Sequence, residues 1–147
     1  MAEVVARAMV AEAGLAERVV VDSAGTGDWH VGGLMHRGSS AQLAASGYDG
    51  SAHRARQYRP SWLAERDLVL AMDASNLDTL RRFAKDADDD HRIRLFGEVA
   101  GLDGRDVPDP YGADSREFAR VLAMIESGVV RLVDQLKALL KTPAAEG

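Results

Sequence analysis

The sequence of 147 residues contains no cysteine. Disulfides, thiolate metal sites and catalysis by a thiol of this chain are therefore excluded. Its histidines include no pair spaced as i and i+4, and they are His30, His36, His53 and His91. We therefore expect no metal site and no other cofactor.

Long apolar runs and an excess of positive charge are also missing. No run approaches the ~20 residues that a membrane-spanning helix requires, and no charged-then-apolar leader precedes the domain. We therefore expect a cytoplasmic protein that does not bind membranes, with export by a leaderless route left open. The net charge is −5, and only residues 54–56 and 81–82 form short basic clusters. This distribution argues against nucleic acid as the main partner.

The composition is that of a globular domain. Apolar residues make up 46% of the chain and charged residues 28%, and this length is sufficient for one domain with a real core. We expect that domain to cover residues 1–141. Residues 142–147 are expected to form a disordered tail.

Short apolar runs typical of strands alternate along the chain with longer segments in which apolar residues recur at helical spacing. Short β-branched or continuous apolar runs predict buried strands at residues 19–21, 67–72 and 93–96. Helical spacing predicts helices at residues 1–13, 37–46, 60–66, 75–84 and 115–140. This alternation is typical of an α/β domain with a parallel sheet, which binds ligands at the carboxyl ends of its strands.

Local signals refine four of these elements. Ser75 begins a pattern that resembles a capping box, and Gly128 is expected to interrupt the last helix. Trp62 is expected to pack inward from a helical turn. The acidic residues 85–90 are expected to be plain solvated surface.

Polar side chains follow each predicted strand. Ser23 and a glycine-rich loop with Trp29 and His30 follow the first strand, and Asp73 follows the second. An aromatic ring on such a loop can form a wall of a binding pocket or fold back on the core. These side chains are compatible with one shared pocket, but they do not identify a reaction.

Asp109 follows the third predicted strand in the segment 106–112, which reads Asp-Val-Pro-Asp-Pro-Tyr-Gly. Pro108 and Pro110 fix their own φ angles and bias the residue before each away from helix. A carboxyl group held in a rigid loop suits a general acid, because geometry comes before pKa in acid–base catalysis. Proline and aspartate are equally common in ordinary turns.

Four stretches, taken together, resemble the low-molecular-weight protein-tyrosine-phosphatase family, especially its actinobacterial members. They are residues 21–32, 53–57, 71–77 and 107–112. The resemblance implies a three-layer α/β fold with a parallel sheet of strand order 2-1-3-4 and helices on both faces. It also implies hydrolysis of phosphotyrosine in proteins through a phosphocysteine, which forms in a C-x-x-x-x-x-R loop without any cofactor.

The resemblance also implies roles for individual residues. Asp109 matches the general acid and base. The walls of the substrate pocket would be Trp29, His30 and Tyr111. The residues that support the phosphate loop would be Ser23, His53 and Asp73.

Two departures from the family pattern stand out. The family normally has two adjacent tyrosines in its acid loop, whereas Gly112 follows Tyr111 here. Family members also begin with a strand and a loop ending in Cys-Arg-Ser-Pro, often followed by Met-Ala-Glu, and this chain starts with Met-Ala-Glu. We therefore expect that the first strand, the nucleophilic cysteine and the phosphate-binding arginine are missing, through a start codon assigned too late.

This departure has consequences for activity and for association. Without its nucleophile the chain is expected to be catalytically incompetent, and its unpaired strand edges are expected to favour self-association. Two alternatives to a phosphatase stay open, namely an arsenate reductase on the same fold and a non-catalytic binding module. The lack of downstream cysteines and the acid loop favour the phosphatase.

Overall fold

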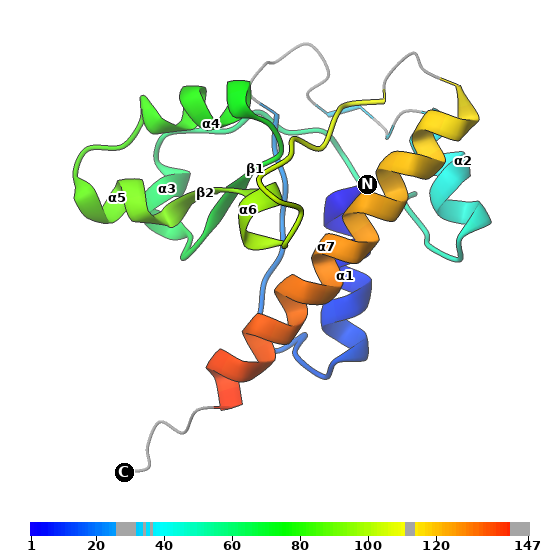
Figure 1. The fold of residues 1–147 in the computed structure, drawn as a ribbon, viewed down its shortest axis with the longest axis horizontal. Coiled ribbons are helices and arrows are strands. Elements are labelled where there is room, and N and C mark those ends of the chain that lie inside the picture. The colour runs from blue at the N-terminus through cyan, green and yellow to red at the C-terminus, as the bar shows by residue number, and fades with distance from the viewer. Residues whose placement is uncertain (26–31, 34, 36, 111–113, 142–147) are drawn as a thin grey trace.

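The computed structural model describes residues 1–25, 32–33, 35, 37–110 and 114–141 (Figure 1). The predictions for Trp29, His30, His36 and Tyr111 lie outside the described residues, as does the predicted tail at 142–147.

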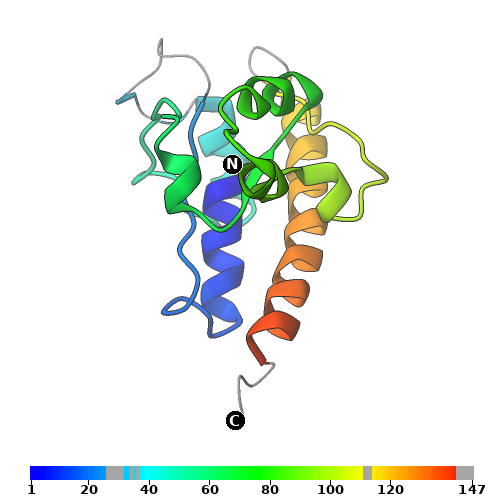
Figure 2. The same cartoon turned by 90° about the vertical axis from the view of Figure 1, so that its left-hand side faces the viewer.

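Two long helices from opposite ends of the chain lie side by side. Helix α1 (Ala2–Glu12) packs along α7 (Ser115–Lys141), and α2 (Arg37–Ala45) covers the first turns of α7 (Figures 1 and 2). Their contact forms the larger apolar cluster, whose buried members on α1 and α7 are Val5, Val10, Val121, Leu122, Ile125, Val129 and Val133. The predicted helices at residues 1–13, 37–46 and 115–140 are thus confirmed.

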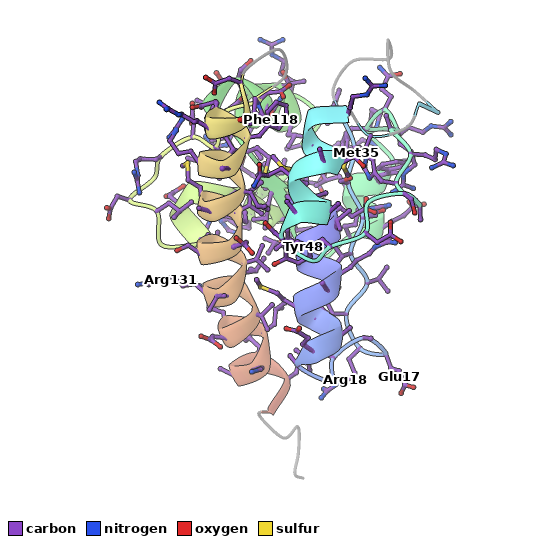
Figure 3. The ribbon with its side chains drawn as sticks, turned by 90° about the vertical axis from the view of Figure 1, so that its right-hand side faces the viewer. Glu17, Arg18, Met35, Tyr48, Phe118 and Arg131 are labelled. Carbon is purple, nitrogen blue, oxygen red and sulfur yellow. The ribbon has the colours of Figure 1, made fainter. Side chains whose placement is uncertain are left out.

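Helix α7 is continuous through Gly128, so the predicted interruption is wrong. The absence of a side chain at Gly128 allows the ring of Phe96 to pack closely against α7, because a Cβ atom there would lie 2.7 Å from that ring. Gly38 does the same for α2, where a Cβ atom would lie 2.5 Å from the ring of Phe118 (Figure 3). Tyr48, just beyond α2, donates a hydrogen bond of 2.7 Å to Glu126 of α7.

The sheet of the described residues has two parallel strands, β1 (Val69–Ala71) and β2 (Ile93–Leu95). Their register pairs Val69 with Ile93 and Ala71 with Leu95. The alternate residues of β1 contact different clusters, since Ala71 belongs to a smaller apolar cluster with Leu63 and Leu80, while Leu70 packs against the larger cluster. The sheet therefore lies between two helical layers, which confirms the α/β fold with a parallel sheet.

Short helices surround these strands. They are α3 (Trp62–Glu65) before β1, α4 (Ala74–Arg81) and α5 (Ala87–Arg92) between the strands, and α6 (Phe96–Val99) after β2. Helices α5 and α6 were not predicted. Asp86 begins α5, because its carboxylate accepts a hydrogen bond of 2.9 Å from the Asp89 backbone N–H, as N-terminal capping aspartates do.

Two local predictions were wrong. Helix α4 is capped by Asp73 rather than Ser75, because the Asp73 carboxylate accepts the Asn76 backbone N–H at 2.8 Å. In α3 the buried side chain is that of Leu63, which is 2% exposed. Trp62 does not enter the core and stays partly exposed. The guanidinium groups of Arg56 and Arg66 lie over its ring.

The predicted buried strand at residues 19–21 is also wrong for the described residues. This segment is extended but pairs with no strand, and Val20 is 93% exposed. The side chain of Arg7 donates to the carbonyl oxygen of Val21 at 3.0 Å. Three β-branched residues favour an extended backbone, but a strand forms only where a neighbouring strand accepts its hydrogen bonds.

Candidate active site

Two of the predicted support residues meet at one carboxylate in the first turn of α1. The hydroxyl of Ser23 donates a hydrogen bond of 2.7 Å to Oε1 of Glu3, and Nδ1 of His53 lies 3.8 Å from the same oxygen. Arg7, one turn further along α1, places its Nη2 3.4 Å from Oε2. The Glu3 side chain is only 11% exposed, so this contact holds three segments together at the start of α1.

His53 faces this carboxylate from a poorly hydrated position. Its Nδ1 is buried and has no hydrogen-bond partner among the described residues. Burial lowers the pKa of His53, and the nearby Glu3 carboxylate opposes that change. Burial thus favours the uncharged form of the imidazole, because the charged form is poorly solvated there.

Asp109 lies near the same helix end. Burial lowers the pKa of the Met1 amino group, while the carboxylates of Glu3 and Asp109 oppose this. Both carboxylates therefore act on the amino group of Met1, which precedes α1, although Asp109 is over a hundred positions away in sequence. The side chain of Asp109 is exposed, whereas Val107 and Pro110 on either side are buried.

The loop that carries Asp109 is fixed to the carboxyl end of β1. The backbone N–H of Val107 donates to the Met72 carbonyl at 2.8 Å, and the Asp106 carboxylate accepts the Ala74 backbone N–H at 3.1 Å. Asp73 caps α4, the helix that begins with Ala74, so it lies beside the Asp109 loop and not at the Glu3 contact. The structure thus brings Ser23 and His53 together at Glu3, whereas Asp73 and the Asp109 loop lie together at the carboxyl end of β1.

Sequence reasoning missed two residues of this arrangement. Glu3 joins Ser23 to His53, and Asp106 ties the acid loop to α4. The available signal for Glu3 was its position in the first turn of the predicted helix, because an acidic side chain there interacts favourably with the helix dipole. Beside Glu3 and His53 lies a cavity of about 360 Å³, which Tyr48 and Asp49 also line.

These features define the class of protein: an α/β domain that gathers titratable side chains where a parallel strand ends and a helix begins. The sequence model of the low molecular weight phosphotyrosine protein phosphatase family matches residues 1–142. The chain therefore belongs to the low molecular weight phosphotyrosine protein phosphatase family, as its motifs predicted.

Curated relatives agree with this assignment. A low molecular weight protein-tyrosine-phosphatase of Streptomyces coelicolor is 42% identical, and the match covers 99% of this chain and 90% of the relative. YfkJ of Bacillus subtilis, also a low molecular weight protein-tyrosine-phosphatase, is 35% identical over 93% of this chain and 86% of its own length. The actinobacterial origin of the first relative fits the predicted subgroup.

Solved structures show the same fold. A protein tyrosine phosphatase of Entamoeba histolytica superimposes with a TM-score of 0.86 at 25% identity, covering 93% of this chain and 87% of that chain. The crystal structure of Bacillus subtilis YfkJ gives a TM-score of 0.82 at 30% identity, covering 93% and 85%. Within the described residues, no helix has the length and apolarity to cross a membrane.

Proposed function

We propose that this domain is the body of a phosphatase that acts on phosphotyrosine in proteins, with a thiolate supplied by a segment that precedes Met1. The observation that carries the proposal is the contact of Ser23 and His53 with Glu3 in the first turn of α1, in a chain of this family, with the Asp109 carboxylate acting on the Met1 amino group at the same helix end. A helix N-terminus with backbone N–H groups favours a bound anion such as a phosphate.

The proposed chemistry has two steps. The thiolate attacks phosphorus and forms an S–P bond, while the aryl oxygen departs with the proton of the Asp109 carboxyl. The Asp109 carboxylate then takes a proton from water, whose oxygen attacks phosphorus and breaks the S–P bond. Asp109 is thus the general acid and then the general base.

The remaining predicted residues have supporting roles in this proposal. Ser23, His53 and Asp73 brace the phosphate loop, and Trp29, His30 and Tyr111 enclose the aryl ring. The His53 imidazole and the Ser23 hydroxyl suit this support, because both provide hydrogen bonds and burial favours the uncharged form of His53.

The 147 residues by themselves have no cysteine, and we expect no phosphatase activity from them. A protein that carries the amino-terminal segment of the Streptomyces coelicolor relative before Met1 is expected to hydrolyse para-nitrophenyl phosphate. The rate difference should be on the order of 10⁶, since removing a nucleophile that acts with its partners costs about that much.

Two controls make this experiment decisive. A Cys→Ser change in the added segment must abolish the activity, and both proteins must be folded by circular dichroism. Comparable hydrolysis by the pure cysteine-free chain would contradict the thiolate mechanism. A folded, lengthened protein that does not hydrolyse aryl phosphates would contradict the proposed activity.

We also propose that the isolated chain self-associates through its open strand edges. Within the described residues β1 pairs only with β2, and the extended segment at 19–21 pairs with no strand. The backbone N–H and carbonyl of Val20 have no hydrogen-bond partner among the described residues, and its side chain is 93% exposed. Unpaired edges of this kind are templates for pairing with another chain.

A charge on this edge should reduce the association. Val20→Lys is expected to shift the chain toward monomer in analytical ultracentrifugation at micromolar concentration, because edge lysines oppose strand pairing. Leu139→Lys is the matched control, since Leu139 is 70% exposed but lies near the end of α7. A monomeric wild-type chain, or an equal effect of both substitutions, would refute pairing through residues 19–21.

A further inference from the structure

Gly25 and Gly32, which flank residues 26–31 in the sequence, are both hydrogen-bonded to one strip of chain, residues 55–58. The backbone N–H of Gly25 donates to the Arg56 carbonyl at 2.7 Å, and the N–H of Tyr58 donates to the Gly25 carbonyl at 2.7 Å. On the other side, Gly32 donates to Ala55 at 2.7 Å, and Ala55 donates to Gly33 at 3.0 Å. The position of residues 55–58 therefore determines the positions of Gly25 and Gly32.

That strip is in turn fixed by one carboxylate. Oδ2 of Asp22 accepts a hydrogen bond of 3.0 Å from Nη2 of Arg56, and it also accepts from Nη2 of Arg66. Nε of Arg66 donates to Oδ1 of Asp22 at 3.2 Å, so the contact with Arg66 uses both carboxylate oxygens. Bidentate arginine contacts of this kind restrict orientation as well as distance.

The two arginines are also held by an aromatic ring. The guanidinium carbon of Arg56 lies 4.8 Å from the ring centroid of Trp62, and that of Arg66 lies 4.4 Å from it. Trp62 belongs to α3, and Tyr58 contacts its ring edge-on at a centroid distance of 5.8 Å. We define Asp22, Arg56, Arg66 and Trp62 as the Asp22 clamp.

We propose that Asp22 is a positioning residue for substrate recognition, because the Asp22 clamp fixes residues 55–58 and, through their hydrogen bonds, Gly25 and Gly32. The inference rests on the proposed function for the roles of Trp29 and His30, which lie between Gly25 and Gly32 in the sequence. Asp22 immediately precedes Ser23, so one short stretch carries both the proposed phosphate-loop support and the carboxylate that fixes residues 55–58.

The clamp differs from an isolated surface ion pair. Exposed pairs contribute little, but networks with bidentate geometry are the exception. The side chains of Asp22 and Arg66 are each 25% exposed, and that of Arg56 is 44% exposed. Hydrogen bonding to Arg66 holds the pKa of Asp22 below its ordinary value of 3.8, and Arg56 adds to this effect.

The first test uses the 147-residue chain itself and does not depend on activity. Asp22→Asn keeps the shape of the side chain but removes the charge that both arginines share. Amide hydrogen exchange at Gly25, Gly32 and Tyr58 is expected to accelerate at least about tenfold, as a lost local opening energy of ~1.4 kcal/mol would produce. Unchanged exchange at these amides would overturn the clamp.

A matched control separates the clamp from a general loss of charge. Glu117→Gln also removes one carboxylate bonded to an arginine, since Glu117 accepts from Nε of Arg120 at 3.0 Å within α7. It should leave exchange at Gly25 and Gly32 at the wild-type rate. If both substitutions accelerate these amides equally, the effect is global destabilisation and the proposal fails.

The pH dependence supplies a second readout. A carboxyl group whose pKa is lower in the folded state stabilises the protein above its unfolded pKa of about 3.8 and loses that contribution as pH falls through the folded value. The melting temperature of the wild type should therefore exceed that of Asp22→Asn at pH 7, and the two should converge in acid. A constant difference at every pH would show that the carboxylate charge is not involved.

The kinetic test uses the lengthened, active protein described above. Asp22→Asn is expected to raise KM for a phosphotyrosine peptide about fivefold or more, while kcat stays within about twofold, because binding rather than chemistry is disturbed. Asp22→Glu should restore part of the loss. A fall in kcat of about fivefold or more without a change in KM would overturn the positioning role. An inactive lengthened wild type would refute the proposed function but would leave the hydrogen-exchange result standing.

Discussion

Replacement of Asp109 by asparagine should lower kcat of the lengthened protein by about 10²–10⁴-fold, the range that general acid catalysis contributes. Asparagine has nearly the same shape but carries no proton to give to the departing aryl oxygen. The buried neighbours Val107 and Pro110, together with the Val107–Met72 hydrogen bond of 2.8 Å, hold the loop in place without the Asp109 carboxyl group. The fold should therefore survive the change, and the melting temperature should confirm this.

The leaving group provides an internal check on this result. Para-nitrophenolate departs more easily without a proton than the phenolate of tyrosine, so the loss should be smaller with para-nitrophenyl phosphate. Asp103→Asn is the matched control, since Asp103 is exposed and its φ of 56° is one that asparagine also tolerates. An Asp109→Asn protein that keeps wild-type kcat on a phosphotyrosine peptide would remove Asp109 from the mechanism.

Replacement of Gly97 by alanine should lower the free energy of unfolding by about 2 kcal/mol or more, although alanine is the better helix former. A Cβ atom at Gly97 would overlap the carbonyl oxygen of Arg105 and lie 2.9 Å from its carbonyl carbon. These are backbone atoms, so they cannot rotate away as a side chain can. Overpacking typically costs about 1–3 kcal/mol and occasionally more. A clash with backbone atoms falls at the upper end, so about 2 kcal/mol or more remains after the ~1 kcal/mol that alanine gains over glycine in a helix is subtracted.

Gly47→Ala separates this steric effect from a conformational one. Gly47 has a φ of +89°, but nothing lies within 4 Å of its Cβ position. Its replacement should cost about 1–2 kcal/mol through backbone conformation alone. Chemical denaturation of the three proteins should rank wild type, Gly47→Ala and Gly97→Ala in order of falling stability. A Gly97→Ala protein as stable as the wild type would mean that the turn after α6 moves freely.

The long helices and the two strands were predictable because their own residues determine them. The apolar spacing on α7 is long enough to outweigh Gly128. Strand β1 is a continuous apolar run, and β2 places the exposed Arg94 between the buried Ile93 and Leu95. Residues 19–21 show the opposite case, because β-branched side chains favour extension but pairing depends on another segment. The short helices α5 and α6 follow from single caps and turns, which apolar spacing does not reveal.

The candidate site was predictable in part. Ser23, His53, Asp73 and Asp109 were identified through the family resemblance, and their roles remain predictions. The structure adds that Ser23 and His53 meet at Glu3, and that Asp106 ties the loop of Asp109 to the start of α4, which Asp73 caps. Contacts between residues 20 to 32 positions apart, such as Ser23 with Glu3 and Asp106 with Ala74, have no periodic signal in the sequence.

The two apolar clusters on opposite faces of β1 have a consequence for how the molecule melts. The smaller cluster, with Leu63, Leu80 and Ile93, draws its members from residues 58–93 alone, whereas the larger cluster joins both ends of the chain. A contiguous stretch with its own buried side chains can open as a cooperative unit while the paired helices α1 and α7 stay intact. Heating should therefore release the region around α3, α4 and α5 first, so calorimetric and van't Hoff enthalpies should disagree.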